Sequence, residues 1–104
     1  MESLFSYIEE RFVPGAAEKP LRYYFSLGED PLYKWSVLID KDGCRIAKGK
    51  PEGGEADCVI KTSASLWERI VRQHYIPDPA EFVSGAIKTN DIELLQTFVR
   101  IFNL

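Results

Sequence analysis

His74 is the only histidine in the sequence, so a serine or cysteine nucleophile that needs a histidine base would have to use it. No serine elbow and no acidic partner stand beside it in the sequence. Cys44 and Cys58 form no C-x-x-C pair, and with one histidine they match no zinc-binding spacing. We therefore predict no catalytic residues, no metal, no cofactor and no enzymatic activity. His74 is expected at a helix end, where it reaches solvent or stabilises the C-terminal dipole.

Glycine-rich phosphate loops are also not indicated. Gly49, Gly53 and Gly54 lie between two predicted strands and do not open a helix, so their backbone N–H groups would not converge on a phosphate. We interpret them as turn residues.

The length and the composition predict a single domain over residues 1–104 that can bury a core without disulfides. A net charge of −3 argues against general nucleic-acid binding, which needs a clustered basic surface. The N-terminus does not resemble a secretory signal, and no apolar run approaches the ~20 residues that span a bilayer. We expect a cytoplasmic protein with reduced thiols.

One segment is locally basic. Residues 34–50 carry five basic residues against Asp40 and Asp42. Edge lysines that discourage strand pairing explain this pattern, and a transient contact with an anionic membrane surface is the alternative. The basic residues are Lys34, Lys41, Arg45, Lys48 and Lys50.

The N-terminal elements follow from hydrophobic periodicity. Apolar residues at helical spacing predict a helix over residues 4–13, with Ser3 as its cap and Pro14-Gly15 as its stop. Alternating apolar residues then predict strands over 21–27, 33–40, 44–48 and 56–62, with a loop over 49–55.

The apolar faces of the first two strands are aromatic. Phe25 lies on the inner face of the first, and Tyr33, Trp35 and Val37 on that of the second, where we expect Trp35 to face Phe98. The hairpin after the second strand is predicted to use the positive φ that glycine accepts in Asp42-Gly43.

The period then changes from 2 to 3.6. Ser65-x-x-Glu68 predicts a capping box for a helix that ends near Tyr75. Asp78-Pro79 opens a short helix that Gly85 stops, and residues 86–89 form a fifth strand. Asn90-x-x-Glu93 is predicted to cap a last helix that runs almost to the C-terminus.

This last helix is apolar over roughly half its circumference, from Ile92 to Phe102, whereas a helix on one sheet needs a stripe of about 100°. The surplus would face another helix, the wall of a ligand cavity, or a second copy of the chain in a homodimer.

The order of elements resembles the sterol carrier protein type 2 (SCP2-like) lipid-transfer domain. The resemblance covers nearly the whole chain and includes KWSVLIDKDG, ADCVIKTSASLWERI, DPAEFVSGAIK and the closing apolar helix. One departure is Asn90-Asp91, where similar domains usually have Gly-Asp; we expect asparagine to tolerate the left-handed geometry.

The resemblance implies an α+β fold, with order α-β-β-β-β-α-α-β-α and a five-stranded, mostly antiparallel sheet covered on one face by helices. It also implies non-catalytic binding and transfer of an apolar lipid (fatty acid, acyl-CoA, sterol or isoprenoid-like) in a tunnel between sheet and helices. The residues that would line this tunnel, for each of which core packing is the alternative, are Phe25, Trp35, Val37, Trp67, Ile70, Phe82, Leu95, Phe98 and Phe102.

A second hypothesis keeps the same fold but fills its core. The protein would then be an interaction or dimerisation module that docks through its C-terminal helix. A continuous apolar cavity of roughly 300 Å³ or more would favour the carrier.

Overall fold

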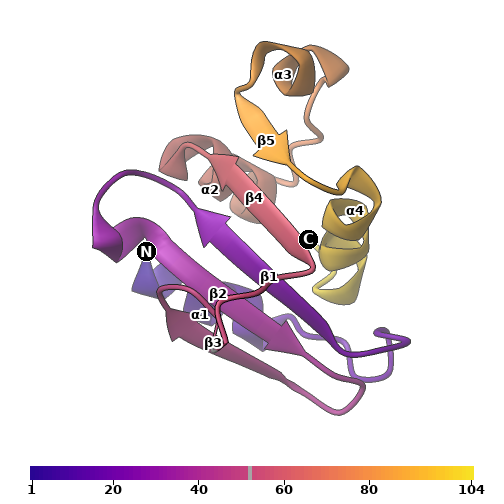
Figure 1. The fold of residues 1–104 in the computed structure, drawn as a ribbon. Coiled ribbons are helices and arrows are strands. Elements are labelled where there is room, and N and C mark those ends of the chain that lie inside the picture. Colours follow the sequence, from indigo (N-terminus) through magenta and orange to yellow (C-terminus); the bar gives the residue numbers. More distant parts are fainter. Residues whose placement is uncertain (52) are drawn as a thin grey trace.

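The computed structural model describes residues 1–51 and 53–104, and its elements follow the predicted order (Figure 1). The α+β class is therefore confirmed. The predicted loop over 49–55 includes residue 52, which lies outside the described residues. The elements are α1 (Glu2–Glu10), β1 (Leu21–Ser26), η1 (Pro31–Tyr33), β2 (Lys34–Ile39), β3 (Cys44–Lys48), β4 (Cys58–Thr62), α2 (Ala64–Gln73), α3 (Pro79–Ser84), β5 (Ile87–Thr89) and α4 (Ile92–Ile101).

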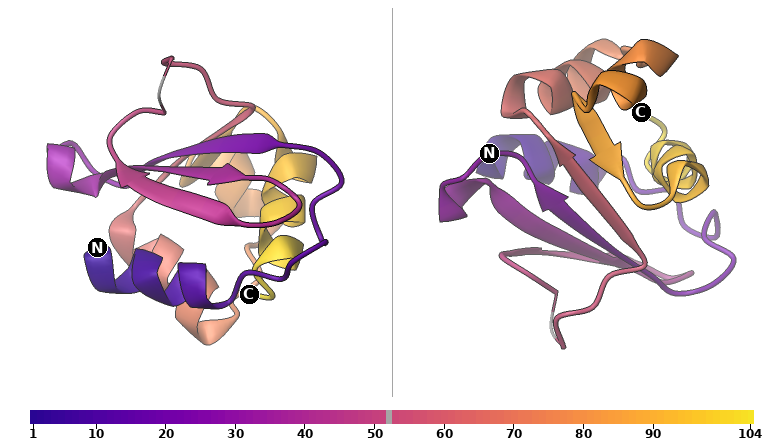
Figure 2. Two further views of the ribbon diagram at one scale, coloured as in Figure 1. Left: turned by 90° about the horizontal axis from the view of Figure 1, so that it is seen from below. Right: turned by 45° about the horizontal axis from the view of Figure 1, so that its top comes forward.

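The five strands form one sheet in the order β3-β2-β1-β4-β5. Three neighbouring pairs are antiparallel, and the central pair β1–β4 is parallel. Figure 2 shows α1, α2 and α4 gathered on one face of this sheet. The mostly antiparallel sheet with helices on one face is thus as predicted. Within residues 1–51 and 53–104, no helix covers the other face, which we call the outer face.

The core lies between the sheet and the helices. Along β1 and β4 buried residues alternate with more exposed ones, because successive side chains of a strand point to opposite faces. Phe98 of α4 stands at the centre of an aromatic cluster, with ring centroids 4.8 Å from Tyr23, 5.1 Å from Phe25 and 4.5 Å from Phe102. Each such fully buried side chain contributes ~1.5–3 kcal/mol by leaving water.

The first helix differs from the prediction at both ends. It begins at Glu2 with Met1 as its N-cap, so Ser3 lies inside it, and it ends at Glu10. The chain leaves the helix early because it is bound to the C-terminal segment. The Arg11 guanidinium donates to the Asn103 carbonyl oxygen at 2.7 and 3.1 Å, and the Val13 N–H donates to the Ile101 carbonyl oxygen at 2.9 Å.

The second strand begins one residue later than predicted. Tyr33 belongs to η1 and is 38% exposed, so it does not continue the inner face. The Asp30 carboxylate accepts from the Leu32 N–H at 2.8 Å and thereby stabilises this turn before β2.

The hairpin between β2 and β3 does not use a left-handed glycine. Gly43 has no positive φ; instead, the Asp40 carboxylate accepts hydrogen bonds from the N–H groups of Asp42 and Gly43, at 2.8 and 2.9 Å. The prediction for this turn was wrong because an aspartate side chain can satisfy the turn without unusual backbone geometry.

Two helix caps are also displaced from their predicted positions. Ser63, not Ser65, caps α2 by accepting from the Leu66 N–H at 3.1 Å. Asp91 caps α4, while Asn90 has no positive φ and accepts from the Val59 N–H of β4 at 2.7 Å. Asn90 extends the pairing of β4 rather than forming a left-handed turn.

The short helix α3 is as predicted. Asp78 and Glu81 form a reciprocal capping box, and Gly85 ends the helix at φ 86°. Among residues 1–51 and 53–104, no helix has the length and apolar character needed to cross a bilayer.

Candidate functional site

An apolar pocket of about 230 Å³ lies among the three C-terminal helices. It is lined from α2 by Ile70, from α3 by Phe82 and from α4 by Leu95 and Val99. The chain between α2 and α3 closes one side. The remaining lining residues are His74, Tyr75, Ile76, Pro77, Ile92, Gln96 and Leu104.

The pocket has an exposed apolar rim. Ile76 is 85% exposed and Ile92 is 46% exposed, and both line the pocket. Val83 of α3, next to Phe82 in the chain, is 89% exposed. Isolated apolar side chains are common on protein surfaces, but these belong to the entrance of a concave apolar site or stand beside it.

Three of the nine residues predicted to contact a ligand line this pocket. They are Ile70, Phe82 and Leu95. The other six are buried in the core between sheet and helices, where aromatic rings and aliphatic side chains pack against one another. These six are Phe25, Trp35, Val37, Trp67, Phe98 and Phe102.

Trp35 lies on the inner face, as predicted, but its neighbour is on another helix. Its ring stacks on Phe5 of α1, with centroids 4.8 Å apart, and its indole N–H donates to the Leu32 carbonyl oxygen at 3.0 Å. Phe98 packs on β1 instead. Alternation places a residue on a face of the sheet but does not say which helix covers that strand.

Trp67 is a polar irregularity of this core. Its ring centroid lies 4.8 Å from that of Phe25 and 5.9 Å from that of Phe98, and its indole N–H is buried without a hydrogen-bond partner. A donor left unpaired in this way costs about 1–3 kcal/mol. Packing of the indole ring outweighs that cost, because removing a buried aromatic side chain from a core costs about 3–5 kcal/mol of stability.

The wall formed after α2 is organised by a left-handed residue. His74 has φ 54° and ψ 33° as the C-cap of α2, which turns the chain toward α3. Tyr75 then lies under Arg69, whose guanidinium carbon is 4.2 Å from the ring centroid, a cation–π distance. A hydrogen bond to Glu81 raises the pKa of the Tyr75 phenol. The cation–π contact orients the tyrosine that forms this side of the pocket.

Sequence reasoning missed most of this wall. The predicted helices end near Tyr75 and begin again at Asp78, so Ile76 was given no role, and neither was Leu104. The available signal was an apolar residue directly before Pro77, in a loop where a polar residue would be expected.

The apolar surplus of α4 is used within the domain. Leu95, Phe98 and Ile101 of α4 are buried, as is its C-cap Phe102, while Ile92 is the exposed large apolar residue of the helix. Figure 1 shows α4 beside the end of the sheet, below α3. Most of the apolar half of α4 therefore faces the core and the pocket.

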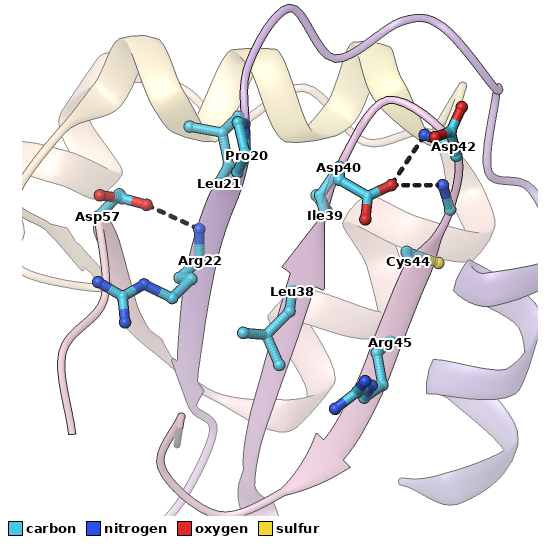
Figure 3. A pocket seen from close by; sticks show the side chains of 11 residues that line it. Pro20, Leu21, Arg22, Leu38, Ile39, Asp40, Asp42, Cys44, Arg45 and Asp57 are labelled. Carbon is cyan, nitrogen blue, oxygen red and sulfur yellow. Dashed lines mark hydrogen bonds between the residues drawn. The ribbon is translucent and has the colours of Figure 1, made fainter. Parts of the chain in front are cut away.

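A second depression, of about 800 Å³, lies on the outer face near the β2–β3 hairpin (Figure 3). Two of its three acidic side chains bind the backbone: the Asp57 carboxylate accepts from the Arg22 N–H at 2.8 Å, and the Asp40 carboxylate holds the hairpin turn. These carboxylates are structural.

No reactive centre is assembled among the described residues. Within residues 1–51 and 53–104, no three histidine, cysteine or acidic side chains are grouped to hold a metal, and His74 forms no hydrogen bond to a nucleophile or a carboxylate. Burial raises the pKa of the Cys44 thiol to about 11 and also raises that of Cys58, so both thiols are poor nucleophiles.

Comparison with solved structures identifies the fold. Sterol carrier protein 2 from Yarrowia lipolytica superposes with a TM-score of 0.54 at 17% identity, covering 99% of this chain and 76% of that one. A UbiJ-SCP2 ubiquinone synthesis protein gives a TM-score of 0.58 at 18% identity, covering 92% and 75%. The chain therefore has the sterol carrier protein 2 fold, and the resemblance is confirmed at the level of the fold.

A larger protein contains a similar unit. The stereoselective inverting sec-alkylsulfatase Pisa1 from Pseudomonas sp. matches with a TM-score of 0.71 at 15% identity, over 90% of this chain. The chain spans 15% of that enzyme's length. No protein-family model and no curated protein sequence matches the chain.

Proposed function

We propose that the chain binds an alkyl or acyl chain in the apolar pocket among α2, α3 and α4 and carries it without chemical change. The observation that carries this proposal is the pocket itself: a concave site of about 230 Å³ with apolar walls from three helices and an exposed apolar rim. Concave sites with apolar walls and a few polar groups are where proteins bind small apolar molecules.

The volume limits the ligand. It is below the roughly 300 Å³ that we expected of a carrier, which is the size at which ordinary ligand pockets begin, and an apolar cavity of ~150 Å³ holds one benzene. By proportion, 230 Å³ holds roughly nine carbon atoms. This suits a segment of a fatty-acyl or isoprenoid chain and is too small for the four fused rings of a sterol.

The structural relatives are compatible with such a ligand. A ubiquinone synthesis protein and a sec-alkylsulfatase share the fold, and both names refer to compounds with an aliphatic chain. Sterol carrier protein 2 is named for a carrier rather than for a catalyst. A cargo that belongs to isoprenoid or quinone biosynthesis is therefore one version of this proposal.

The expected affinity is weak. Burying roughly nine methylene groups contributes about 7 kcal/mol, while association costs ~4–15 kcal/mol. The surplus is about 3 kcal/mol at most, which corresponds to a dissociation constant in the millimolar range and favours exchange over storage. Because this net free energy of binding is small, a change that fills the space of a few methylene groups in the pocket should weaken binding strongly.

Titration of the purified protein with an added fatty acid of about nine carbon atoms, monitored by NMR, tests the proposal. The wild type should bind this fatty acid with a dissociation constant in the millimolar range, and Val99→Phe, which adds a ring to the pocket wall, should lose the binding. Val59→Phe is the matched control, because Val59 is 36% exposed on the outer face of β4 and lies away from the pocket. If neither the wild type nor the control binds an added fatty acid, the carrier proposal is wrong.

The closely packed core favours a second candidate, an interaction module of the same fold. In this version α4 would dock a partner or a second copy through Ile92 and the pocket rim. Light scattering at micromolar concentration tests the homodimer, and Ile92→Glu should abolish any dimer that forms. A monomer at all concentrations would exclude self-association.

A further inference from the structure

Three lysines lie in one row across the outer face of the sheet. Ser26 of β1 is paired with Lys34 of β2 on one side and with Lys61 of β4 on the other, and Lys61 is paired with Lys88 of β5. We call Lys34, Lys61 and Lys88 the lysine row. Neighbouring strands are ~4.8 Å apart, so the row brings three ammonium groups within reach of one small ligand.

The row points away from the helices. The residue beside each lysine in its strand, Trp35, Ile60 or Ile87, is buried in the core. Since side chains alternate between faces, the lysines lie on the outer face. Figure 1 shows where this occurs: β1 and β4 end side by side, next to the beginning of β5.

The charges of the row are not neutralised by ion pairs. In the part of the chain that the structure describes, the salt bridges involve Arg22, Lys48 and Arg72, and none involves the row. Glu29 is the acidic residue that lines the same depression. Like charges directly opposite each other on two strands are destabilising, and Lys61 and Lys88 are such a pair. A chain of net charge −3 therefore concentrates unpaired positive charge at one place.

The site is partly preorganised. The Lys34 ammonium donates a hydrogen bond to the Ser26 hydroxyl at 2.6 Å, and Ser26 is only 8% exposed although it lies on the helix-free face. An ammonium has three donors, so two remain for a ligand after this bond. The Ser26 hydroxyl also retains its own hydrogen as a donor.

The depression beside the row has a volume of about 310 Å³. Ser63 lines it and is the N-cap of the ten-residue helix α2, whose N-terminal dipole adds positive potential. Gly85 also lines it, and a Cβ at that position would stand 3.2 Å from the Lys88 side chain. Glycine thus leaves Lys88 room beside the depression.

We propose that the lysine row binds a phosphate group, either of a free phosphate ester or of an anionic lipid headgroup. Three ammonium groups, a buried hydroxyl and a helix N-terminus form a set of donors, and Glu29 is the one carboxylate among the residues that line the depression. The depression and the apolar pocket share no lining residue, so this inference does not rest on the proposed function.

The test compares two double variants with equal change in charge. Lys61→Gln/Lys88→Gln removes two members of the row, and Lys19→Gln/Arg100→Gln removes two exposed basic residues elsewhere. The first probe is inorganic phosphate, whose binding is detected by NMR of the lysine side chains. The second is phosphatidylcholine vesicles with or without phosphatidic acid, whose binding is measured by flotation.

We expect the wild type and the Lys19/Arg100 variant to bind, and the Lys61/Lys88 variant to bind at least about tenfold more weakly, as loss of charge-assisted hydrogen bonds implies. A response to phosphate alone supports a soluble ester, and a response to phosphatidic acid vesicles alone supports a lipid headgroup. The proposal is overturned if the wild type responds to neither probe, or if both variants weaken binding equally.

Discussion

Replacing Phe98 and Phe82 by alanine separates core residues from pocket residues. Both were predicted to contact a ligand, but Phe98 is fully buried among four aromatic rings, whereas Phe82 is partly buried on the pocket wall. The two variants remove the same side-chain atoms. Any difference between them therefore reports the surroundings of each ring.

The expected loss of stability differs several-fold between the two variants. Phe98→Ala should lower the free energy of unfolding by about 3–5 kcal/mol, near the upper end, because aromatic contacts of ~0.5–1.5 kcal/mol each are lost with the buried area. Phe82→Ala should cost about 1 kcal/mol, the average for a point substitution. A domain of this size has about 5–15 kcal/mol in total, so Phe98→Ala leaves a marginal protein.

Urea denaturation measures both losses. With a slope of ~1–3 kcal/mol per molar urea, Phe98→Ala should move the midpoint by roughly 2 M and Phe82→Ala by less than about 1 M. Binding of a fatty acid should weaken in Phe82→Ala, which removes a wall of the pocket. If Phe98→Ala kept its stability and lost the fatty acid instead, Phe98 would line a ligand cavity and our assignment of the core would be wrong.

Two further predictions concern pH and backbone geometry. Burial raises the pKa of Tyr23 well above 10.0 and that of Cys44 from 9.0 to about 11, so the folded state keeps these protons at pH values where the unfolded state loses them. The stability that depends on these two groups should be complete below pH 9 and fall as the pH rises. For Tyr23 the free energy of unfolding should fall by ~1.4 kcal/mol per pH unit above the unfolded pKa of 10.0. Alkaline titration of the urea midpoint measures this, and a flat profile between about pH 9 and 11 would contradict it. Gly85→Ala should cost about 1–2 kcal/mol because φ is 86°, whereas Gly43→Ala, with no positive φ and nothing within 4 Å of the added Cβ, should be nearly neutral in thermal unfolding.

The sequence predicted the element order and the inner faces well, because both depend on local periodicity. Phe25, Trp35 and Val37 were placed on the inner face, and all are buried. The partner of Trp35 was wrong, since alternation does not reveal which helix covers a strand. The lysine row depends on the parallel pairing of β1 with β4, and no local pattern links Lys34 to Lys61.

Turns were the least predictable feature, for a related reason. Asp40 and Asp91 each use a side-chain oxygen to accept backbone N–H groups, and the pattern alone assigned those turns to Gly43 and Asn90. Several residues near a turn can satisfy the same donors. Which one does so depends on where the flanking strands end.

The position of the pocket follows from how the large side chains are distributed. Rings from β1, α2 and α4 fill the space between sheet and helices, with Phe25, Trp67 and Phe98 in mutual contact. The helix α3 has six residues and none of them is buried, so it closes the space beside α2 and α4 without filling it. The layer between sheet and helices, where a lipid tunnel was predicted, is therefore filled by side chains that supply stability. The volume that we propose for a ligand lies beside the short helix α3.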